Sequence, residues 1–576
     1  MKTSFFRFAA VMALLGPALA GTGPVHASGG NLLDHFYEIW ASDQSNSVPG
    51  QTSRGVAGSY VWIWNSWEME IQLNGGPAAQ PVGCDGFWSA GPCDINELFP
   101  ATLAERDVNG ATGNTLGTSG GAFGRLHGML PDPQHRYMNV NLFAPGAGYV
   151  GIMDGITKEA VALFRVTGTN AGRSVHMSFW NADGSALLVA NLNGKILERI
   201  DITRNKLGRI TGATFNQSAS LGVGKGMVVT DSAKVYRGAN HRGRQMLGKV
   251  AGSYDAAALA DTTPNGACKE NGCGAGDGGA GGRPNNLIIC PIVSDDGNVY
   301  VTMGGGGLLV ADSSTTPMSI IGEYGNQVIN GAGCGGVQEG NEVWLNAGVS
   351  ASPAGATWST FTMYTLDDSQ FGGVPNPENT PLPTVVFQDP GNTATGGNLI
   401  GPAANNSGQL PGTTTRRDAH GAAKTTSGSH IHNVDRIQNN AEVFHTVSKS
   451  RTTYDLTTGG ACGTASVSDD PGLPTNDPAP DLMDTTPDGK YMMVALRGPV
   501  PVSVDHSAQG SCPGVGIIRV KDGGASGELV GVLRSTNTVD TVPVNAPEPG
   551  GHQYTGAERS DPHGASVRRK VPYIIR

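Results

Sequence analysis

The stretch VHMSFWNADGSALLVANLNG, residues 175–194, contains the pattern that decides the fold. His176 stands seven residues before an Asp-Gly turn, and alternating apolar residues follow the turn. Residues 418–436, DAHGAAKTTSGSHIHNVDR, repeat this arrangement with His420 at the same distance before a Ser-Gly turn. A strand, a turn and a second strand with alternating apolar residues are typical of a β-hairpin. We call the position of the histidine in this repeated unit the slot.

Further copies of the unit occur along the chain. Asp481 fills the slot in DLMDTTPDGKYMMVALRG, and His127 and His563 have similar surroundings in RLHGMLPDPQHRYMNVNLF and DPHGASVRRKVPYIIR. Two weaker units carry Ile289 in the slot, beside a cysteine, and Cys334 near it. The chain therefore contains seven unit starts, near residues 127, 176, 289, 334, 420, 481 and 563.

The repeated units predict an all-β protein, a seven-bladed β-propeller. Units of this length with about four short strands are typical of propeller blades, and no long amphipathic helix separates the strands. The chain contains 86 glycines in 576 residues, which fits many turns between strands. Since the chain ends soon after the seventh start, the last blade lacks its outer strands. We expect residues 58–75, rich in strand formers, to supply an N-terminal strand that closes the ring and removes free sheet edges.

The predicted domains follow from these boundaries. A basic start and a short apolar stretch predict a signal peptide over residues 1–20. Residues 21–57 form an N-terminal segment outside the propeller, which occupies residues 58–576. Two long inserts, near 215–283 and 366–415, interrupt the repeat. Neither insert could bury much apolar surface, so we expect surface loops.

The N-terminal stretch and the cysteines predict an exported protein. The apolar stretch is too short to anchor the chain in a membrane, so we expect a periplasmic or secreted protein. The formal net charge of −10 is unclustered and gives no reason to expect nucleic acid as a partner. Eight cysteines fit an oxidising compartment, with a thiolate metal site as the alternative. The pairing stays open; the candidate pairs are Cys84/Cys93, Cys268/Cys273, Cys290/Cys334 and Cys462/Cys512.

The slot residues predict a metal site. The first strand of each propeller blade lines the central channel, so equivalent positions form a ring around one axis. We expect the metal ligands to be His127, His176, His420, Asp481 and His563. Imidazoles with a carboxylate suit copper, zinc, iron and nickel, and a reduced cysteine beside them would favour copper. A repeated histidine that only bonds backbone groups of a neighbouring blade is the alternative.

Two arginines and two aspartates lie at fixed distances from the slots. Arg436 and Arg497 each follow a slot by sixteen residues. We predict that they act in catalysis by binding an anionic substrate, with an inter-blade salt bridge as the alternative. Asp418 and Asp561 each precede a slot histidine by two residues and are expected to orient the imidazoles or to cap turns.

The units resemble those of the seven-bladed propeller superfamily that includes YVTN-type repeat proteins and lactonase-like propellers. HMSFWNADGSALLVANLNG, DLMDTTPDGKYMMVALRGP and DPHGASVRR carry the resemblance, which extends from about residue 124 to the C-terminus. It implies the fold, whereas propellers host many chemistries. The histidine-lined channel is similar to those of two exported copper enzymes, nitrous oxide reductase and thiocyanate dehydrogenase. The match concerns blade positions alone, at His127, His176, His420 and His563.

This chain departs from the copper enzymes at Asp481, where another histidine would strengthen the parallel, and it has no recognisable cupredoxin domain. We predict an exported metal-dependent oxidoreductase that uses copper, or another divalent metal, on a small molecule at the channel mouth. An exported electron-transfer partner would accompany this activity. The alternatives are a non-catalytic binding or scaffold propeller and a lactonase-like metal-dependent hydrolase.

Overall fold

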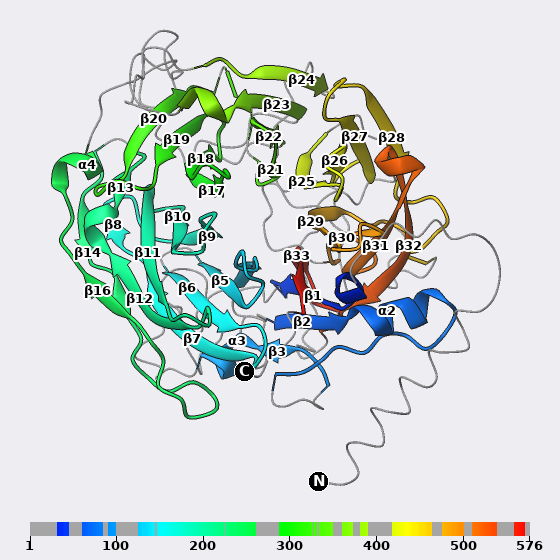
Figure 1. Ribbon diagram of the computed structural model, residues 1–576, viewed down its shortest axis with the longest axis horizontal. Helices are drawn as coiled ribbons and strands as arrows, with labels where there is room; N and C mark the ends of the chain where they lie inside the picture. The colour runs from blue at the N-terminus through cyan, green and yellow to red at the C-terminus, as the bar shows by residue number, and fades with distance from the viewer. Residues whose placement is uncertain are drawn as a thin grey trace.

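Seven β-sheets are arranged around a central axis (Figure 1). The chain is thus a seven-bladed β-propeller, as the repeat predicts. The structure is a computed structural model, and it describes residues 32–44, 60–84, 90–99, 125–144, 147–224, 226–260, 287–326, 328–329, 331, 333–348, 360–371, 381–389, 417–463, 475–499, 510–537 and 558–570.

Blades 1 to 3 each contain four consecutive antiparallel strands, named here from the axis outward. Blade 1 consists of β4 (Arg125–Gly128), β5 (Tyr137–Ala144), β6 (Ala147–Asp154) and β7 (Glu159–Arg165). Blade 2 consists of β9 (Val175–Trp180), β10 (Ala186–Asn191), β11 (Ile196–Arg204) and β12 (Ile210–Asn216). Blade 3 consists of β17 (Ile288–Val293), β18 (Asn298–Met303), β19 (Leu308–Asp312) and β20 (Ser319–Tyr324).

Blades 4 to 6 have the same order. Blade 4 consists of β21 (Gly336–Glu339), β22 (Glu342–Ala347), β23 (Phe361–Asp367) and β24 (Thr384–Asp389). Blade 5 consists of β25 (Ala419–Lys424), β26 (His430–Asp435), β27 (Asn440–His445) and β28 (Arg451–Asp455). Blade 6 consists of β29 (Pro480–Thr485), β30 (Tyr491–Leu496), β31 (Gly514–Lys521) and β32 (Ser526–Arg534).

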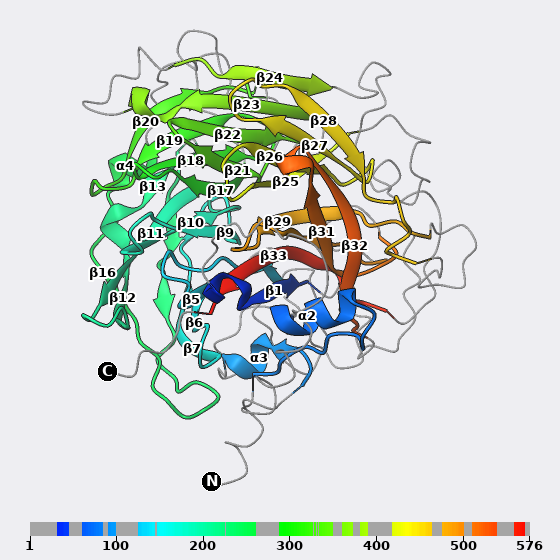
Figure 2. The same cartoon turned by 45° about the vertical axis from the view of Figure 1, so that its right-hand side comes forward.

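Blade 7 combines strands from the two ends of the chain. Its innermost strand is β33 (Pro562–Arg569), followed outward by β1 (Tyr37–Asp43), β2 (Tyr60–Asn65) and β3 (Cys93–Asp94). Figure 2 shows β33 beside β1, and the two strands pair antiparallel.

The N-terminal boundary predicted at residue 58 is therefore wrong, because β1 belongs to the blade. Its side chains alternate between the two neighbouring blades: Ile39 packs toward blade 6 and Trp40 toward blade 1. The segment 58–75 is a strand only in its first half. Helix α2 (Ser66–Leu73) follows β2, and it packs Met69 against blade 6.

The described parts of the two inserts contain secondary structure that was not predicted. Within the first, β13 (Leu221–Gly222), β14 (Val229–Asp231), β15 (Lys234–Val235) and β16 (Lys249–Ala251) pair with strands of blades 1 and 2 or the adjoining β8 (Gly168–Thr169). Helix α4 (Ala256–Ala260) buries Leu259 in the same region. The second insert supplies β24, the outermost strand of blade 4. Strands of two or three residues that extend existing sheets leave no periodic pattern in the sequence.

Short helices complete the described secondary structure. They are η1 (Leu32–His35), α3 (Ile95–Leu98), η3 (Gln217–Ala219), η4 (Asp368–Phe371) and η7 (Asp522–Gly524). Among the described residues, no helix combines the length and the apolar character needed to cross a bilayer.

Seven hydrophobic clusters fill the spaces between neighbouring blades, one for each pair. In β18, for example, Val299 and Val301 face blade 2, whereas Tyr300 between them packs toward Val343 of blade 4. Such alternation is the period of two that a strand imposes on its side chains. Each fully buried side chain of this size contributes about 1.5–3 kcal/mol, so the blades hold one another in place around the axis.

Three disulfides lie within the described residues: Cys84–Cys93, Cys290–Cys334 and Cys462–Cys512. All three are among the candidate pairs. The fourth candidate, Cys268/Cys273, and the predicted signal peptide lie outside the described residues. Disulfides are compatible with an exported protein.

Candidate functional site

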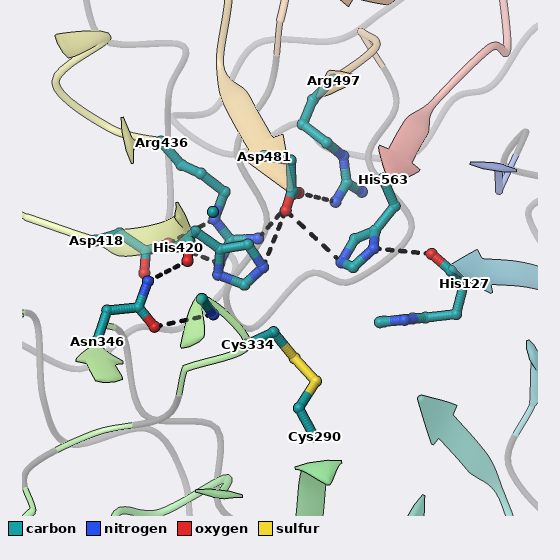
Figure 3. Close-up of polar contacts among 12 residues, drawn as sticks. His127, Cys290, Cys334, Asn346, Asp418, His420, Arg436, Asp481, Arg497 and His563 are labelled. Atoms are coloured by element: carbon teal, nitrogen blue, oxygen red, sulfur yellow. Dashed lines mark hydrogen bonds and ion pairs between the residues drawn. A yellow bond between two sulfur atoms is a disulfide. The ribbon is translucent and has the colours of Figure 1, made fainter. Parts of the chain in front are cut away.

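The innermost strands of five blades bring the five predicted ligands into one buried ring. The slot residue is second or third in each strand, and each of these residues is between 0% and 7% exposed. Figure 3 shows the carboxylate of Asp481 at the centre of contacts to His420, His563, Arg436 and Arg497. The structure therefore brings slot residues that are distant in sequence together at one place, as expected from the repeat.

An irregularity in the sheet accompanies the slot in six blades. The pairing of the innermost strand shifts register across His127, His176, His420, Asp481 and His563, and across Ile289 in blade 3. A β-bulge of this kind re-aims a side chain and interrupts the ladder. The bulge therefore explains how a residue in a twisted sheet directs its side chain into the channel.

Polar side chains on the second strand bind the backbone freed by these bulges. Asn141 donates to the carbonyl oxygen of Gly128 at 2.9 Å, and Asn433 donates to that of Gly421 at 2.9 Å. In blade 3, the hydroxyl of Thr302 on β18 hydrogen-bonds to the backbone N–H and the carbonyl oxygen of Cys290. Sequence reasoning missed these residues. The signal was present, because Asn141 and Asn433 follow their slots by fourteen and thirteen residues in the two units.

Glycine after the slot lets the inner strands approach closely. A Cβ atom on Gly421 would overlap the carbonyl oxygen of Asp481, and one on Gly128 would overlap the sulfur of Met177. At Gly564 the nearest atom, Oγ of Ser42, would lie at 2.7 Å. The His-Gly pairs are thus a packing requirement that brings neighbouring slots within reach.

His420, Asp481 and His563 form the tightest group in the ring. Nε2 of His420 lies 2.9 Å from Oδ1 of Asp481, and Nε2 of His563 lies 3.8 Å from the same oxygen. The contact between His420 and Asp481 falls outside hydrogen-bond geometry, and neither atom has another hydrogen bond among the described residues. At this distance the two groups form an ion pair when His420 is protonated, and both are ligand atoms for a metal ion when it is neutral.

The tautomer of His563 adds to this pattern. Its Nδ1 lies 2.9 Å from the carbonyl oxygen of His127, so Nδ1 carries the proton that it donates. In a neutral ring Nε2 then presents a lone pair toward Asp481. A lone pair and a carboxylate repel unless a cation lies between them. The three side chains therefore fit a metal ion, and a backbone hydrogen bond on the far nitrogen is the usual support for a histidine ligand.

His127 and His176 extend the ring beside this group. The His127 ring lies 3.9 Å from the His176 ring and 3.9 Å from the His563 ring, measured between centroids. Nδ1 of His176 faces the sulfur atoms of Cys290 and Cys334, at 3.8 and 4.0 Å. Because those sulfur atoms are joined in a disulfide, neither is the reduced ligand that would have favoured copper.

The two predicted catalytic arginines are held in ion pairs across blades 5 to 7. Arg436 bonds Oδ2 of Asp418 at 2.6 Å and Oδ2 of Asp481 at 3.3 Å. Arg497 bonds Oδ2 of Asp481 at 2.7 Å and Oδ2 of Asp561 at 2.6 Å. All five side chains are buried. This arrangement corresponds to the alternative of an inter-blade salt bridge. Asp418 and Asp561 pair with these arginines, whereas we expected them to orient the imidazoles or to cap turns.

Burial and charge set the protonation of the ring. Burial lowers the pKa of His176 to about 3 and that of His563 well below its usual value. Burial alone would raise the pKa of Asp481, but His420, His563 and Arg436 outweigh it and hold that pKa well below its usual value. The neutral imidazoles of His176 and His563 and the ionised carboxylate of Asp481 are thus in the forms that bind metal ions.

A funnel of about 550 Å³ opens at the opposite end of the inner strands. Its walls come from residues that follow the slots, among them Trp180 after His176, Lys424 after His420 and Asp484 after Asp481. The ring and this funnel therefore occupy different ends of the channel.

No protein-family model matches the chain, and no curated protein is similar to it. The periplasmic gluconolactonase of Pseudomonas aeruginosa matches with 10% identity over 93% of this chain and 100% of that chain, at a TM-score of 0.43. A putative 6-phosphogluconolactonase of Bacteroides fragilis matches with 9% identity over 93% and 99%, at 0.41. A dihydro-heme d1 dehydrogenase matches with 8% identity over 94% and 77%, at 0.37. Values this low assign no activity to this chain.

Proposed function

We propose that this protein is an exported metal-dependent oxidoreductase that binds copper at His420, Asp481 and His563. It would act on a small molecule at the mouth of the channel on the side where these residues lie. The observation that carries the proposal is the buried convergence of two imidazole nitrogens and a carboxylate oxygen, in which Nε2 of His563 presents a lone pair toward Oδ1 of Asp481. This set of ligand atoms suits a metal ion.

The imidazole content of the ring supports copper. Copper(II) stands at the top of the affinity order for nitrogen and oxygen ligands, and His127 and His176 add two imidazoles beside the group. Bound copper would supply a one-electron redox step, so an exported electron-transfer partner belongs to the proposal. The rings of His127 and His176, which lie beside the group, would orient the substrate.

A lactonase-like hydrolase is the second candidate, and two observations favour it. A carboxylate stands at Asp481, and the nearby sulfur atoms are held in a disulfide. Two histidines with one carboxylate form a ligand set of zinc hydrolases, in which the metal supplies an activated water. Binding of an anionic substrate by Arg436 or Arg497 stays a prediction under either function.

Metal analysis of protein isolated from the exported fraction tests the proposal. We expect copper in the wild type, its loss in His420→Ala, and its retention in the control His430→Ala, which lies on β26 at the opposite end of the hairpin from His420. Zinc together with lactone or ester hydrolysis would support the second candidate. Absence of any metal, with unchanged stability in His420→Ala, would identify a non-catalytic scaffold.

A further inference from the structure

The Cys290–Cys334 disulfide and His176 form a second group of ligand atoms in the ring. They come from three consecutive blades: His176 from β9, Cys290 from β17 and Cys334 from the segment before β21. Nδ1 of His176 lies 3.8 and 4.0 Å from the two sulfur atoms. All three side chains are buried. A cross-link between blades 3 and 4 does not itself need an imidazole from blade 2 beside it.

We propose that, once this disulfide is reduced, Cys290, Cys334 and His176 bind a soft d10 ion, Cu⁺ or Zn²⁺. Two thiolates and an imidazole are ligands that both ions prefer. The site shares no ligand with the His420–Asp481–His563 group, so metal binding at it does not depend on the function proposed above.

The spacing of the three residues suits such a site. Their ligand atoms lie within 4.8 Å of one another, and the two cysteine Cα atoms are 5.4 Å apart. Zinc–sulfur bonds of about 2.3 Å at a tetrahedral angle place two thiolates about 3.7 Å apart. Rotation about the Cα–Cβ bonds of Cys290 and Cys334 opens the sulfur atoms to this separation, and Nδ1 of His176 already faces them.

The chemistry balances with a dithiol as the reductant. The dithiol attacks one sulfur, closes to its own cyclic disulfide, and delivers two electrons and two protons to Cys290 and Cys334. The ion then displaces the two thiol protons as it binds. Its own oxidation state does not change.

Cobalt(II) is a spectroscopic probe for this site. Full-length protein would be reduced with dithiothreitol without oxygen, freed of the reagent and titrated with Co²⁺. We expect a thiolate-to-cobalt charge-transfer band only after reduction, and its loss in the variant C290S/C334S. The matched control C84S/C93S removes another disulfide and should keep the band. Displacement of Co²⁺ by Cu⁺ or by Zn²⁺ then shows which ion binds more tightly.

A second variant keeps the test valid if C290S/C334S does not fold. His176→Gln retains both cysteines and should weaken Co²⁺ binding by about tenfold or more. An unchanged band in His176→Gln, or no band after reduction of the wild type, would overturn this inference. His420→Ala should leave the band intact; if that variant also loses no other metal, the proposed function fails while this site stands.

Discussion

Arg497 lies 2.7 Å from Oδ2 of Asp481, the carboxylate oxygen opposite the one that faces His420. Arg436 contacts the same Oδ2 at 3.3 Å. The two guanidinium groups thereby fix the carboxylate and leave Oδ1 directed toward the imidazoles. Arg436 and Arg497 are positioning residues in this account, acting on a metal ligand through its second oxygen.

Asp481→Asn tests this division of roles. The variant removes a metal ligand and one of the two carboxylate partners of each buried arginine. We therefore expect loss of bound metal and a decrease of about 3–5 kcal/mol in the free energy of unfolding. Urea unfolding and metal analysis measure the two effects. Asp418→Asn is the control: it also removes a partner of Arg436, and it should lower stability while metal stays bound. Full metal content in Asp481→Asn would show that the ligand assignment is wrong.

Acid should destabilise the metal-free protein. Burial holds the pKa of His176 at about 3, against an ordinary value of 6.5. Between these values the unfolded chain binds a proton that the folded chain does not, so the free energy of unfolding falls as the pH decreases from about 6.5 to about 3. Urea unfolding at a series of pH values would record this slope. His176→Gln should make it shallower, and an identical slope in the variant would contradict the buried neutral imidazole.

Close strand approach predicts a cost for Gly421→Ala. The added Cβ would overlap the backbone of Asp481 and force β25 and β29 apart. Overpacking of this kind costs about 1–3 kcal/mol, and the same shift should weaken metal binding. Gly212→Ala on β12 is the control, because its Cβ would meet Thr203 at an ordinary 3.6 Å. Thermal unfolding and metal titration of both variants decide the point; equal behaviour would show that the spacing is not needed.

Loss of the side-chain hydrogen bond that supports the bulge should also lower stability. Asn433→Ala removes the hydrogen bond to the carbonyl oxygen of Gly421 and leaves that buried oxygen without it. We expect a loss of about 1–3 kcal/mol in the free energy of unfolding and weaker metal binding by the neighbouring His420. Metal titration separates this outcome from a purely structural role, which would lower stability and leave metal affinity unchanged.

The sequence was sufficient to predict the propeller and the ring because both depend on a repeated offset. A slot at a constant distance before a turn places His127, His176 and His420 on equivalent inner strands. The bulges could not be predicted in this way, since they arise from strand pairing. The arginine contacts were ambiguous for a similar reason: Arg436 reaches Asp481 in the next blade, and one sequence does not record the partner.

The blade assembled from both termini shows a second limit. Residues 58–75 were predicted to complete the last blade, and they do supply β2 (Tyr60–Asn65), yet the strand that pairs with β33 is β1 (Tyr37–Asp43). Its alternation of side chains toward blades 6 and 1 is visible in YEIWASD once both neighbours are known. A strand buried on both faces has no polar side to mark its boundary, so its place in the sheet depends on its partner.

Anomalous X-ray diffraction from crystals of protein isolated from the exported fraction, recorded at the copper and zinc edges, tests the central claim most directly. This account predicts a peak within bonding distance of Nε2 of His420, Oδ1 of Asp481 and Nε2 of His563. A structure in which those atoms hydrogen-bond to one another or to water, with no anomalous peak among them, would contradict it.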